Sequence, residues 1–227
     1  MFLNCPMLVN INVDGQNTEY ISVDGVLYSK GMISLECYPA GRISHTYMLP
    51  ANVCVIMSNA FCGNPYLAHI VVDKENKCYT SIAGVLYDKE VQQVVYWSIG
   101  KPYDASSLPQ TVTMIGDDAF YKRPETSIVI PDNITDIGIS AFSNCKNLTS
   151  LTIGRSVQYL AGHVFIKCPN LRTIRVRSIV PPESADAPYF DEKVFKKAIL
   201  YVPKSSLGDY KEMSDWSYFK HIRVLEE

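Results

Sequence analysis

One pattern is repeated in residues 130–153, IPDNITDIGISAFSNCKNLTSLTI, and again in residues 153–176, IGRSVQYLAGHVFIKCPNLRTIRV. Each copy has a small residue followed by Phe, a Cys three residues later, a Leu three residues after the Cys, and then apolar residues at every second position. The copies recur every 22 to 23 residues. A period of about 20–50 residues is typical of solenoids, in which each repeat forms one turn of a coil.

A longer repeat covers the first half of the chain. Shifting the sequence by 59 residues aligns residues 2–30 with residues 61–89 without a gap, and both segments contain the string GVLY. Each long unit is one turn of 23 residues followed by a second turn with an insertion of 13. The insertions lie near residues 25–41 and 84–100, and each has two short β-branched or aromatic runs around a polar centre. This pattern predicts two β-hairpins that project from the coil.

The repeats together predict about eight rungs between residues 2 and 202. The last apolar residue of each rung is Val13, Leu49, Val72, Leu108, Ile130, Ile153, Val176 and Val202. An aromatic residue precedes each of these by 10 to 12 positions: Phe2, Tyr38, Phe61, Trp97, Phe120, Phe142, Phe165 and Phe190. A turn of this length cannot bury its own apolar face, so we expect the turns to stack about 4.8 Å apart, with the aromatic residues in one column.

Local patterns predict the structure of each rung and of the chain's end. The alternating apolar residues predict one strand per rung, and the segment around Ala-Phe is long enough only for a single helical or 3₁₀ turn. Residues 203–227 should form a cap over the last rung. There, Ser206 and Asp209 have the spacing of a capping box, and Trp216 and Phe219 supply apolar bulk.

Composition excludes several functional classes. The 227 residues are 47% hydrophobic and only 19% charged, so the chain has enough core-forming residues to fold. No apolar run approaches the roughly 20 residues of a membrane-spanning helix, and residues 1–13 lack the basic start of a signal peptide. A net charge of −2 argues against nucleic-acid binding.

These motifs resemble the BspA-like leucine-rich repeats of surface and secreted proteins from Bacteroides-type bacteria. The resemblance rests on the Ala-Phe, Cys and Ile-Pro positions of the repeats, the GVLY segments, and the terminal stretch LYVPKSSLGDYKEMSDWSYFKHI. It implies an α/β, β-rich, right-handed leucine-rich-repeat solenoid with parallel strands, two inserted hairpins and a C-terminal helical cap. We expect a single domain over residues 1–227, and a chain that is a piece of a longer protein because the first rung starts abruptly at Phe2.

The resemblance also implies a location outside the cell and no catalysis or cofactor. It implies binding of protein or glycan partners, host extracellular matrix among them, with adhesion as the role. We expect no nucleic-acid partner, no membrane span and a monomer.

The chemistry-bearing residues give no enzyme or metal motif. The seven cysteines contain no CxxC pair and no Cys/His spacing suited to zinc. The four histidines are not combined with a nucleophilic Ser or Cys, and no phosphate-binding glycine loop is present. Cys5, Cys145 and Cys168 share one repeat position. The simplest interpretation is that they are small buried thiols, and a disulfide between Cys145 and Cys168 is the alternative.

Two surface features are candidates for partner binding. Residues 137–182 contain no Asp or Glu but several basic residues, of which Arg172, Arg175 and Arg177 lie on or near one strand. They indicate either a basic patch for an acidic protein or anionic glycan, or ordinary solvated charge. The tyrosines at positions 28, 87, 96 and 103 fall in or near the hairpins, where they either contact a partner or pack against the coil.

The predicted binding surface is the outward side of the strands, because stacking turns one residue per rung into an extended strip. The first outward column is Asn10, His69, Ser127, Ser150 and Thr173, and the second is Asn12, Val71, Val129, Thr152 and Arg175. The alternative to a binding module is a structural spacer in a larger surface protein. A third hypothesis, a glycan-cleaving enzyme, would need a pair of carboxylates, and the outward positions have almost none.

Overall fold

The structure is a computed structural model that describes residues 2, 5–61, 63–184 and 188–226. The chain divides into two compact units, unit 1 over Met1–Pro102 and unit 2 over Tyr103–Glu227. Each unit is described by itself.

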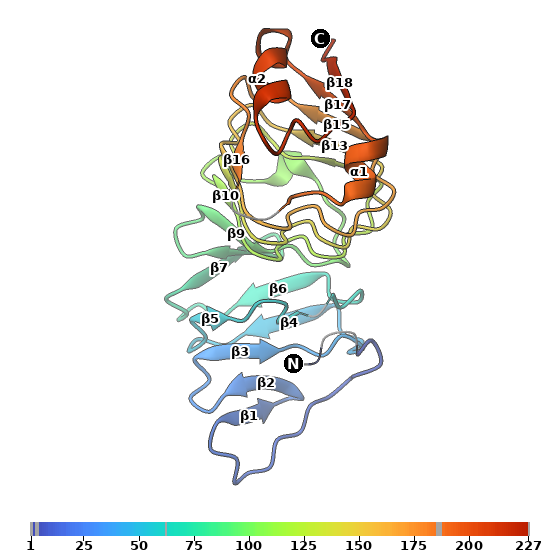
Figure 1. The fold of residues 1–227 in the computed structure, drawn as a ribbon. Helices are drawn as coiled ribbons and strands as arrows, with labels where there is room; N and C mark the ends of the chain where they lie inside the picture. Colours follow the sequence, from blue (N-terminus) through green and yellow to red (C-terminus); the bar gives the residue numbers. More distant parts are fainter. Residues whose placement is uncertain (1, 3–4, 62, 185–187, 227) are drawn as a thin grey trace. The chain divides into compact units, whose positions relative to one another are not determined.

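Unit 2 is a coil of parallel strands (Figure 1). Its elements are η1 (Ala105–Ser107), β10 (Met114–Ile115), β11 (Ser127–Val129), β12 (Asp136–Ile137), β13 (Ser150–Ile153), β14 (Tyr159–Leu160), β15 (Thr173–Val176), β16 (Glu183–Ser184), α1 (Glu192–Lys197), β17 (Ile199–Val202), η2 (Lys204–Ser206), α2 (Leu207–Glu212) and β18 (His221–Val224).

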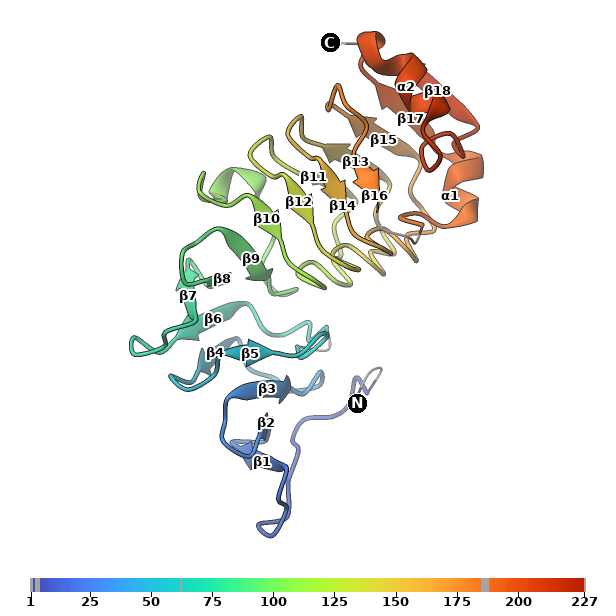
Figure 2. The ribbon, with the colours of Figure 1, turned by 60° about the vertical axis from the view of Figure 1, so that its left-hand side comes forward.

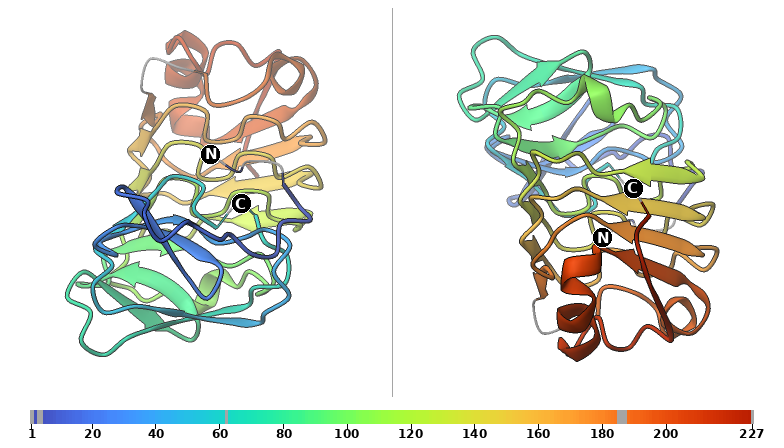
Figure 3. Two further views of the ribbon diagram at one scale, coloured as in Figure 1. Left: turned by 90° about the horizontal axis from the view of Figure 1, so that it is seen from below. Right: turned by 90° about the horizontal axis from the view of Figure 1, so that it is seen from above.

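The strands of unit 2 form two ladders. One ladder has the order β11-β13-β15-β17-β18, and the short strands β10-β12-β14-β16 form the other. All pairings are parallel and in register, so that Leu151 pairs with Ile174 and Ile174 with Leu200. Figure 2 shows the short strands side by side, and Figure 3 (right) shows the two ladders on opposite sides of the coil. The predicted parallel leucine-rich-repeat solenoid is confirmed.

Aromatic rings fill the space between the ladders of unit 2. Phe120 and Phe142 stack with centroids 4.9 Å apart, Phe142 and Phe165 at 5.5 Å, and Phe165 and Phe190 at 5.1 Å. Each of the four side chains is at most 1% exposed. Within unit 2 the predicted aromatic column is therefore confirmed, including Phe190.

The Ala-Phe segments form the predicted single turns of 3₁₀ type but no helix, because the Ala141 N–H donates to the Gly138 carbonyl and the Ser143 N–H to that of Ser140, each three residues back. The Phe120 N–H donates to the carbonyl of Ala141 at 2.8 Å, and the Phe142 N–H donates to that of Val164 at 3.0 Å, both in the next turn of the coil. Residues just before the Ala-Phe pairs have positive φ, such as Ser140 at 55°. Hydrogen bonds within each segment and hydrogen bonds to the next turn of the coil together satisfy the backbone without a helix.

The C-terminal cap covers the last turn with aromatic side chains, as predicted. Tyr210 and Trp216 are fully buried and Phe219 is 4% exposed. The predicted capping box is absent, because the Ser206 hydroxyl accepts no hydrogen bond from the first turn of α2 and donates instead to the Pro203 carbonyl. Near this end of the chain, α1 and β18 were not predicted, and β18 pairs in parallel with β17. The ladder β10-β12-β14-β16 corrects the prediction of one strand per rung.

Unit 1 is built from short strands. They are β1 (Tyr20–Val23), β2 (Val26–Ser29), β3 (Ser34–Cys37), β4 (Thr46–Leu49), β5 (Val55–Ile56), β6 (His69–Val72), β7 (Tyr79–Ile82), β8 (Val85–Asp88) and β9 (Gln93–Tyr96). Strands β4 and β6 pair in parallel and place Leu49 beside Val72, as the rung markers predict.

The 59-residue repeat holds at the level of single hydrogen bonds. The Val13 N–H donates to the Ser22 hydroxyl, and its repeat equivalent, the Val72 N–H, donates to the Ser81 hydroxyl. In the same way, Lys30 Nζ donates to the carbonyl of Asn17, and Lys89 Nζ to that of Asn76. These hydrogen bonds are therefore the same in both copies.

The two predicted hairpins are confirmed, but they do not project. Strands β2 and β3 pair antiparallel, as do β8 and β9. An additional antiparallel strand precedes each hairpin, β1 and β7 respectively. The β2 and β8 residues Val26, Leu27, Val85 and Leu86 are all at most 4% exposed, because these strands contribute to the core of unit 1.

Two rungs depart from the predicted strands. Residues 8–13 form no strand, and the rung that ends at Leu108 contains η1 in its place. In unit 1 the ring that stacks on Phe61 is Tyr96, with centroids 4.3 Å apart, so the aromatic order there differs from a plain column.

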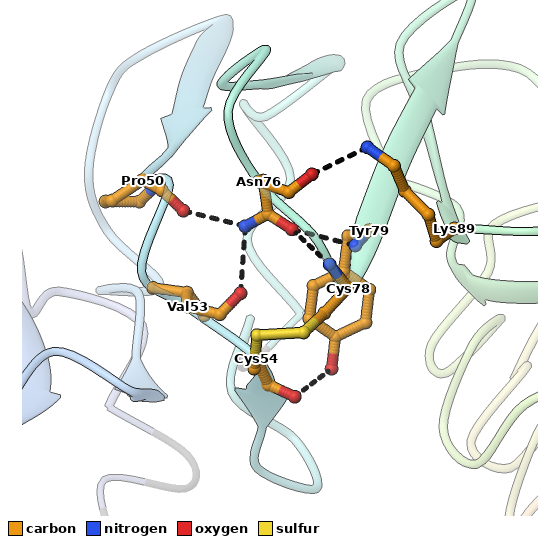
Figure 4. Close-up of a disulfide and its surroundings, with 7 residues drawn as sticks. All are labelled: Pro50, Val53, Cys54, Asn76, Cys78, Tyr79 and Lys89. Atoms are coloured by element: carbon orange, nitrogen blue, oxygen red, sulfur yellow. Dashed lines mark hydrogen bonds between the residues drawn. A yellow bond between two sulfur atoms is a disulfide. The ribbon is translucent and has the colours of Figure 1, made fainter.

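A disulfide between Cys54 and Cys78 connects successive turns of unit 1, with Cα atoms 5.2 Å apart (Figure 4). Beside it, the Asn76 side chain donates to the carbonyls of Pro50 and Val53 and accepts from the N–H groups of Cys78 and Tyr79. This disulfide was not predicted. Its separation of 24 residues, close to one turn, is the signal that could have indicated it.

Candidate binding surface

The outward side of the β11-β13-β15-β17-β18 ladder brings two predicted columns together in unit 2. Each column is extended by two residues that were not predicted. In register, the first file is Ser127, Ser150, Thr173, Ile199 and His221, and the second is Val129, Thr152, Arg175, Tyr201 and Arg223. We call these ten residues the ladder face. The alternating apolar residues of ILYV and IRV, at 199–202 and 222–224, are the sequence signal for the missed members.

Side chains on the ladder face contact one another along the second file. The guanidinium of Arg175 lies over the Tyr201 ring, 5.5 Å from its centroid, and Nη1 of Arg175 is 3.4 Å from the Ser150 hydroxyl. Val129 is 41% exposed, whereas Thr152 is only 9% exposed between its neighbours. The face thus offers an apolar end at β11 and a cationic, aromatic centre at β15 and β17.

The predicted basic residues are not all in one place. Arg175 and Arg177 line a groove, where Arg155 and Lys204 join them. Arg172 does not line it, because its guanidinium turns back to the carbonyls of Pro169 and Leu171 in its own turn. The groove has a cavity volume of about 1540 Å³ and lies where the chain leaves β13, β15, β17 and β18. We call it the basic groove.

One carboxylate lies between two arginines at the basic groove. Nε of Arg155 donates to the Asp132 carboxylate at 2.8 Å, and the backbone N–H of Arg155 donates to the same carboxylate at 3.0 Å. Nη1 of Arg177 lies 3.9 Å from that carboxylate. Partial burial raises the pKa of Asp132, but the hydrogen bonds and charge of Arg155 and the charge of Arg177 outweigh it and hold that pKa below its ordinary value. Asp132 is therefore ionised at neutral pH.

Arg123, another basic residue of unit 2, is buried and pairs with a carboxylate inside the coil. Arg123 occupies the repeat position of the Cys column and is 1% exposed. Its guanidinium forms an ion pair with Glu125, whose carboxylate also accepts from the N–H of Tyr103. The buried charge is thus compensated within the coil and is not available to a partner.

The remaining predicted binding residues belong to unit 1. His69 and Val71 are exposed on β6, where they pair with Thr46 and Met48 of β4. Asn12 is exposed but lies outside the strands, as does Asn10. His69 also packs tightly over Gly84, whose φ of +83° and lack of a Cβ permit the close approach.

The hairpin tyrosines are not exposed, so the alternative that they pack against the coil is confirmed and the alternative that they contact a partner is wrong. Tyr28 is 2% exposed, Tyr87 is 1% and Tyr96 is 7%. The hydroxyls of Tyr28 and Tyr47 form a buried hydrogen bond of 2.7 Å, and burial raises the pKa of both groups. Tyr103 donates its hydroxyl to the carbonyl of Val129. Tyr28, Tyr87 and Tyr96 pack in the core because the hairpin strands are part of it, whereas Tyr103 lies outside the hairpins and is half-buried.

Cys145 and Cys168 are buried thiols and form no disulfide. The Cys145 thiol donates to the carbonyl of Phe120, and the Cys168 thiol to that of Phe142, each one turn back. A hydrogen bond with Cys168, together with burial, raises the pKa of Cys145 well above its ordinary value. Cys5, at the same repeat position, is exposed. The predicted disulfide alternative is therefore wrong, and the thiols at positions 145 and 168 are packing groups.

Within the described ranges no group of three or more His, Cys, Asp or Glu side chains could hold a metal ion. Among the helices of the same residues, none is long and apolar enough to cross a membrane.

Comparison with solved structures places the fold among bacterial leucine-rich repeat proteins. A cell-surface protein of Faecalibacterium prausnitzii A2-165 is 22% identical with a TM-score of 0.58, over 86% of this chain and 51% of that one. The pneumococcal vaccine antigen PcpA is 17% identical with a TM-score of 0.52, over 80% of this chain and 56% of that one. The chain spans about half the length of both. No curated protein matches the sequence significantly.

A family model described as "BspA type Leucine rich repeat region" matches residues 103–197 in 6 copies. The matched range covers most of unit 2, including the stacked Phe residues and the parallel strands described above. Residues 103–197 of this chain are therefore identified, by this match, as a BspA-type leucine-rich repeat region.

Proposed function

We propose that this chain is a non-catalytic binding module for partner proteins, that it acts outside the cell, and that the ladder face is its contact surface. The observation that carries the proposal is the register of five parallel strands, which lines up outward side chains that are far apart in sequence. Such extended faces are what repeat proteins use to bind partners.

The chemistry of the ladder face supports a protein partner. Arg and Tyr are enriched among residues that dominate binding energy, and Arg175 lies against Tyr201 in the middle of the face. Their mutual contact restrains both side chains before a partner arrives, which reduces the entropy lost on binding.

The Cys54–Cys78 disulfide supports a location outside the cytoplasm. Disulfides form and persist in oxidising environments and are rare in reducing ones. The similarity to a bacterial cell-surface protein points the same way. Adhesion to host extracellular matrix is the specific role we propose, with a structural spacer as the competing function.

A binding screen with two double variants tests the proposal. The purified chain is measured against panels of extracellular-matrix proteins and of glycans. The face variant Val129→Arg/Thr173→Arg places two bulky charges on the ladder face. The control Met114→Arg/Tyr159→Arg adds the same charges to the outward side of the other ladder, where Met114 is 40% and Tyr159 39% exposed, close to the 41% of Val129.

We expect saturable binding to a matrix protein that the face variant weakens at least tenfold, about 1.4 kcal/mol, and that the control leaves unchanged. Equal weakening by both variants contradicts the assignment of the face. Absence of saturable binding on both panels contradicts the binding function and favours the spacer.

A further inference from the structure

The basic groove combines surplus positive charge with exposed apolar side chains. Arg155, Arg175, Arg177 and Lys204 line it, against one lining carboxylate, Glu226. Asp132 adds a second carboxylate beside it, which still leaves four cationic side chains against two anionic ones.

The two arginines beside Asp132 remain accessible. The side chain of Arg155 is 72% exposed and that of Arg177 is 50% exposed. A guanidinium has five N–H donors, and a single shared carboxylate leaves most of them unused on these two groups. The arrangement can therefore receive further carboxylates from a partner.

The apolar part of the groove is Ile179, which is 64% exposed, and Val180, which is 73% exposed. Exposed apolar side chains of this size next to each other are unfavourable in water and mark interaction sites when they are clustered. Here they adjoin the arginines in one groove, so a ligand that fills it meets both.

The segment that carries Ile179 and Val180 is held at both ends. The Ser178 hydroxyl donates to the Val180 carbonyl at 2.6 Å, and the Ser178 carbonyl accepts from the buried Tyr210 hydroxyl at 2.9 Å. Beyond the pair, the Pro182 carbonyl accepts from Nε1 of the buried Trp216 at 3.0 Å. The apolar pair is thus presented by a restrained loop anchored to the cap, which lowers the entropic cost of binding.

We propose that the basic groove binds an acidic segment of a partner protein in extended form, with carboxylates against Arg155, Arg177 and Lys204 and apolar side chains against Ile179 and Val180. An anionic glycan would satisfy the arginines but would leave the apolar pair uncovered, which is why a peptide is the better fit. This inference rests on the proposed binding function and assigns it a ligand class.

Fluorescence anisotropy with a defined probe tests the groove directly. The probe is a fluorescein-labelled synthetic peptide that alternates glutamate with leucine, and its matched control has glutamine in place of glutamate. A labelled heparin fragment represents anionic glycans. The protein is the full chain in four forms: unchanged, Arg155→Ser/Arg177→Ser, Ile179→Ser/Val180→Ser, and Lys146→Ser, an exposed cation outside the groove. Circular dichroism confirms that each form is folded.

We expect saturable binding of the glutamate peptide, at least tenfold weaker for the arginine variant and at least threefold weaker for the apolar variant. The glutamine peptide should bind at least tenfold more weakly, and Lys146→Ser should change nothing. Binding of the glutamate peptide should also weaken as NaCl rises from about 0.05 M to about 0.5 M.

Failure of the glutamate peptide to bind, equal weakening by Lys146→Ser, or no effect of the apolar variant each overturns the proposal. Heparin binding in the absence of peptide binding overturns it in favour of a glycan site. The proposed function is tested separately by the face variant Val129→Arg/Thr173→Arg, which alters neither the groove arginines nor the apolar pair. Failure of the groove proposal therefore leaves that test unchanged.

Discussion

The rings of Phe142 and Phe165 stack with centroids 5.5 Å apart and planes 16° from parallel, although one full turn of the coil separates the two residues. The same relationship recurs from Phe120 to Phe142 and from Phe165 to Phe190. The core of unit 2 therefore depends on contacts between equivalent residues of successive turns, and each ring is shared by two neighbours.

Phe142→Ala is expected to destabilise the chain strongly. The side chain is fully buried between two rings, so truncation leaves a cavity that neither neighbour can fill, at a cost of about 3–5 kcal/mol. Urea unfolding followed by circular dichroism measures the loss. The matched control is Tyr159→Ala on the outward side of β14, which should cost under about 1 kcal/mol. Similar losses for the two variants would contradict a stacked core.

Removal of the Cys54–Cys78 disulfide is expected to destabilise unit 1 by about 2–4 kcal/mol, because the cross-link restricts the unfolded chain. The double variant Cys54→Ser/Cys78→Ser is compared with the unchanged chain in urea, each with and without dithiothreitol. The reductant should lower the midpoint of the unchanged chain and leave the double variant unaffected. If neither dithiothreitol nor the double substitution changes the urea midpoint, the disulfide adds no stability.

Asn76→Ala should cost more than the equivalent change in the other copy of the long repeat. Asn76 is buried and its amide bonds four backbone groups, two of which lie one turn back, so its removal leaves buried groups unsatisfied at about 2–4 kcal/mol. Asn17 occupies the same repeat position but is exposed, and water replaces its contacts. Asn17→Ala should therefore cost under about 1 kcal/mol. Thermal unfolding of both variants gives the comparison, and equal shifts would refute it.

Asp132→Asn should lower stability slightly at neutral pH and not at all in strong acid. The folded-state pKa of Asp132 lies below its ordinary value of 3.8, so its stabilising contribution is complete above that value and is lost as the pH falls through the folded-state pKa. The pair with Arg155 is exposed, which limits the contribution to under about 1 kcal/mol. Urea midpoints of the two proteins should differ at neutral pH and converge below the carboxyl range. A difference that persists in acid would mean that Asp132 acts through packing.

The features that repeat could be predicted from the sequence, and the features that occur once could not. The column from Phe120 to Phe190 follows from spacing, because each equivalent residue meets the same neighbours in the next turn. Helix α1 has no equivalent earlier in the chain, so no period indicated it.

Burial of the hairpins was missed for a related reason. The spacing predicts that the two insertions lie outside the coil, but Leu27 of the first and Leu86 of the second contribute to the core of unit 1. Spacing shows where extra residues begin and does not show which side of the coil they cover.

The candidate site was predicted in part. The ladder face follows from strand alternation, which identified Ser150, Thr173 and Arg175 as outward neighbours. The basic groove combines residues that follow different strands, Arg155 after β13 and Lys204 after β17, and the coil alone brings them together. The sequence predicts Arg172 in the same patch, but its guanidinium donates to the carbonyls of Pro169 and Leu171. No sequence pattern indicates such local side-chain bonds.

Register between neighbouring turns is the claim on which the ladder face and the groove both depend, and disulfide trapping measures it directly. In a Cys5→Ser background, Ser150→Cys/Thr173→Cys places two thiols on directly paired residues, within the Cα separation of about 4.4–6.8 Å that a disulfide requires. Ser150→Cys/Arg175→Cys places them two residues out of register. Mass spectrometry after mild oxidation should find the cross-link in the first pair and not in the second. Efficient cross-linking of the second pair, or none in the first, would contradict the in-register coil.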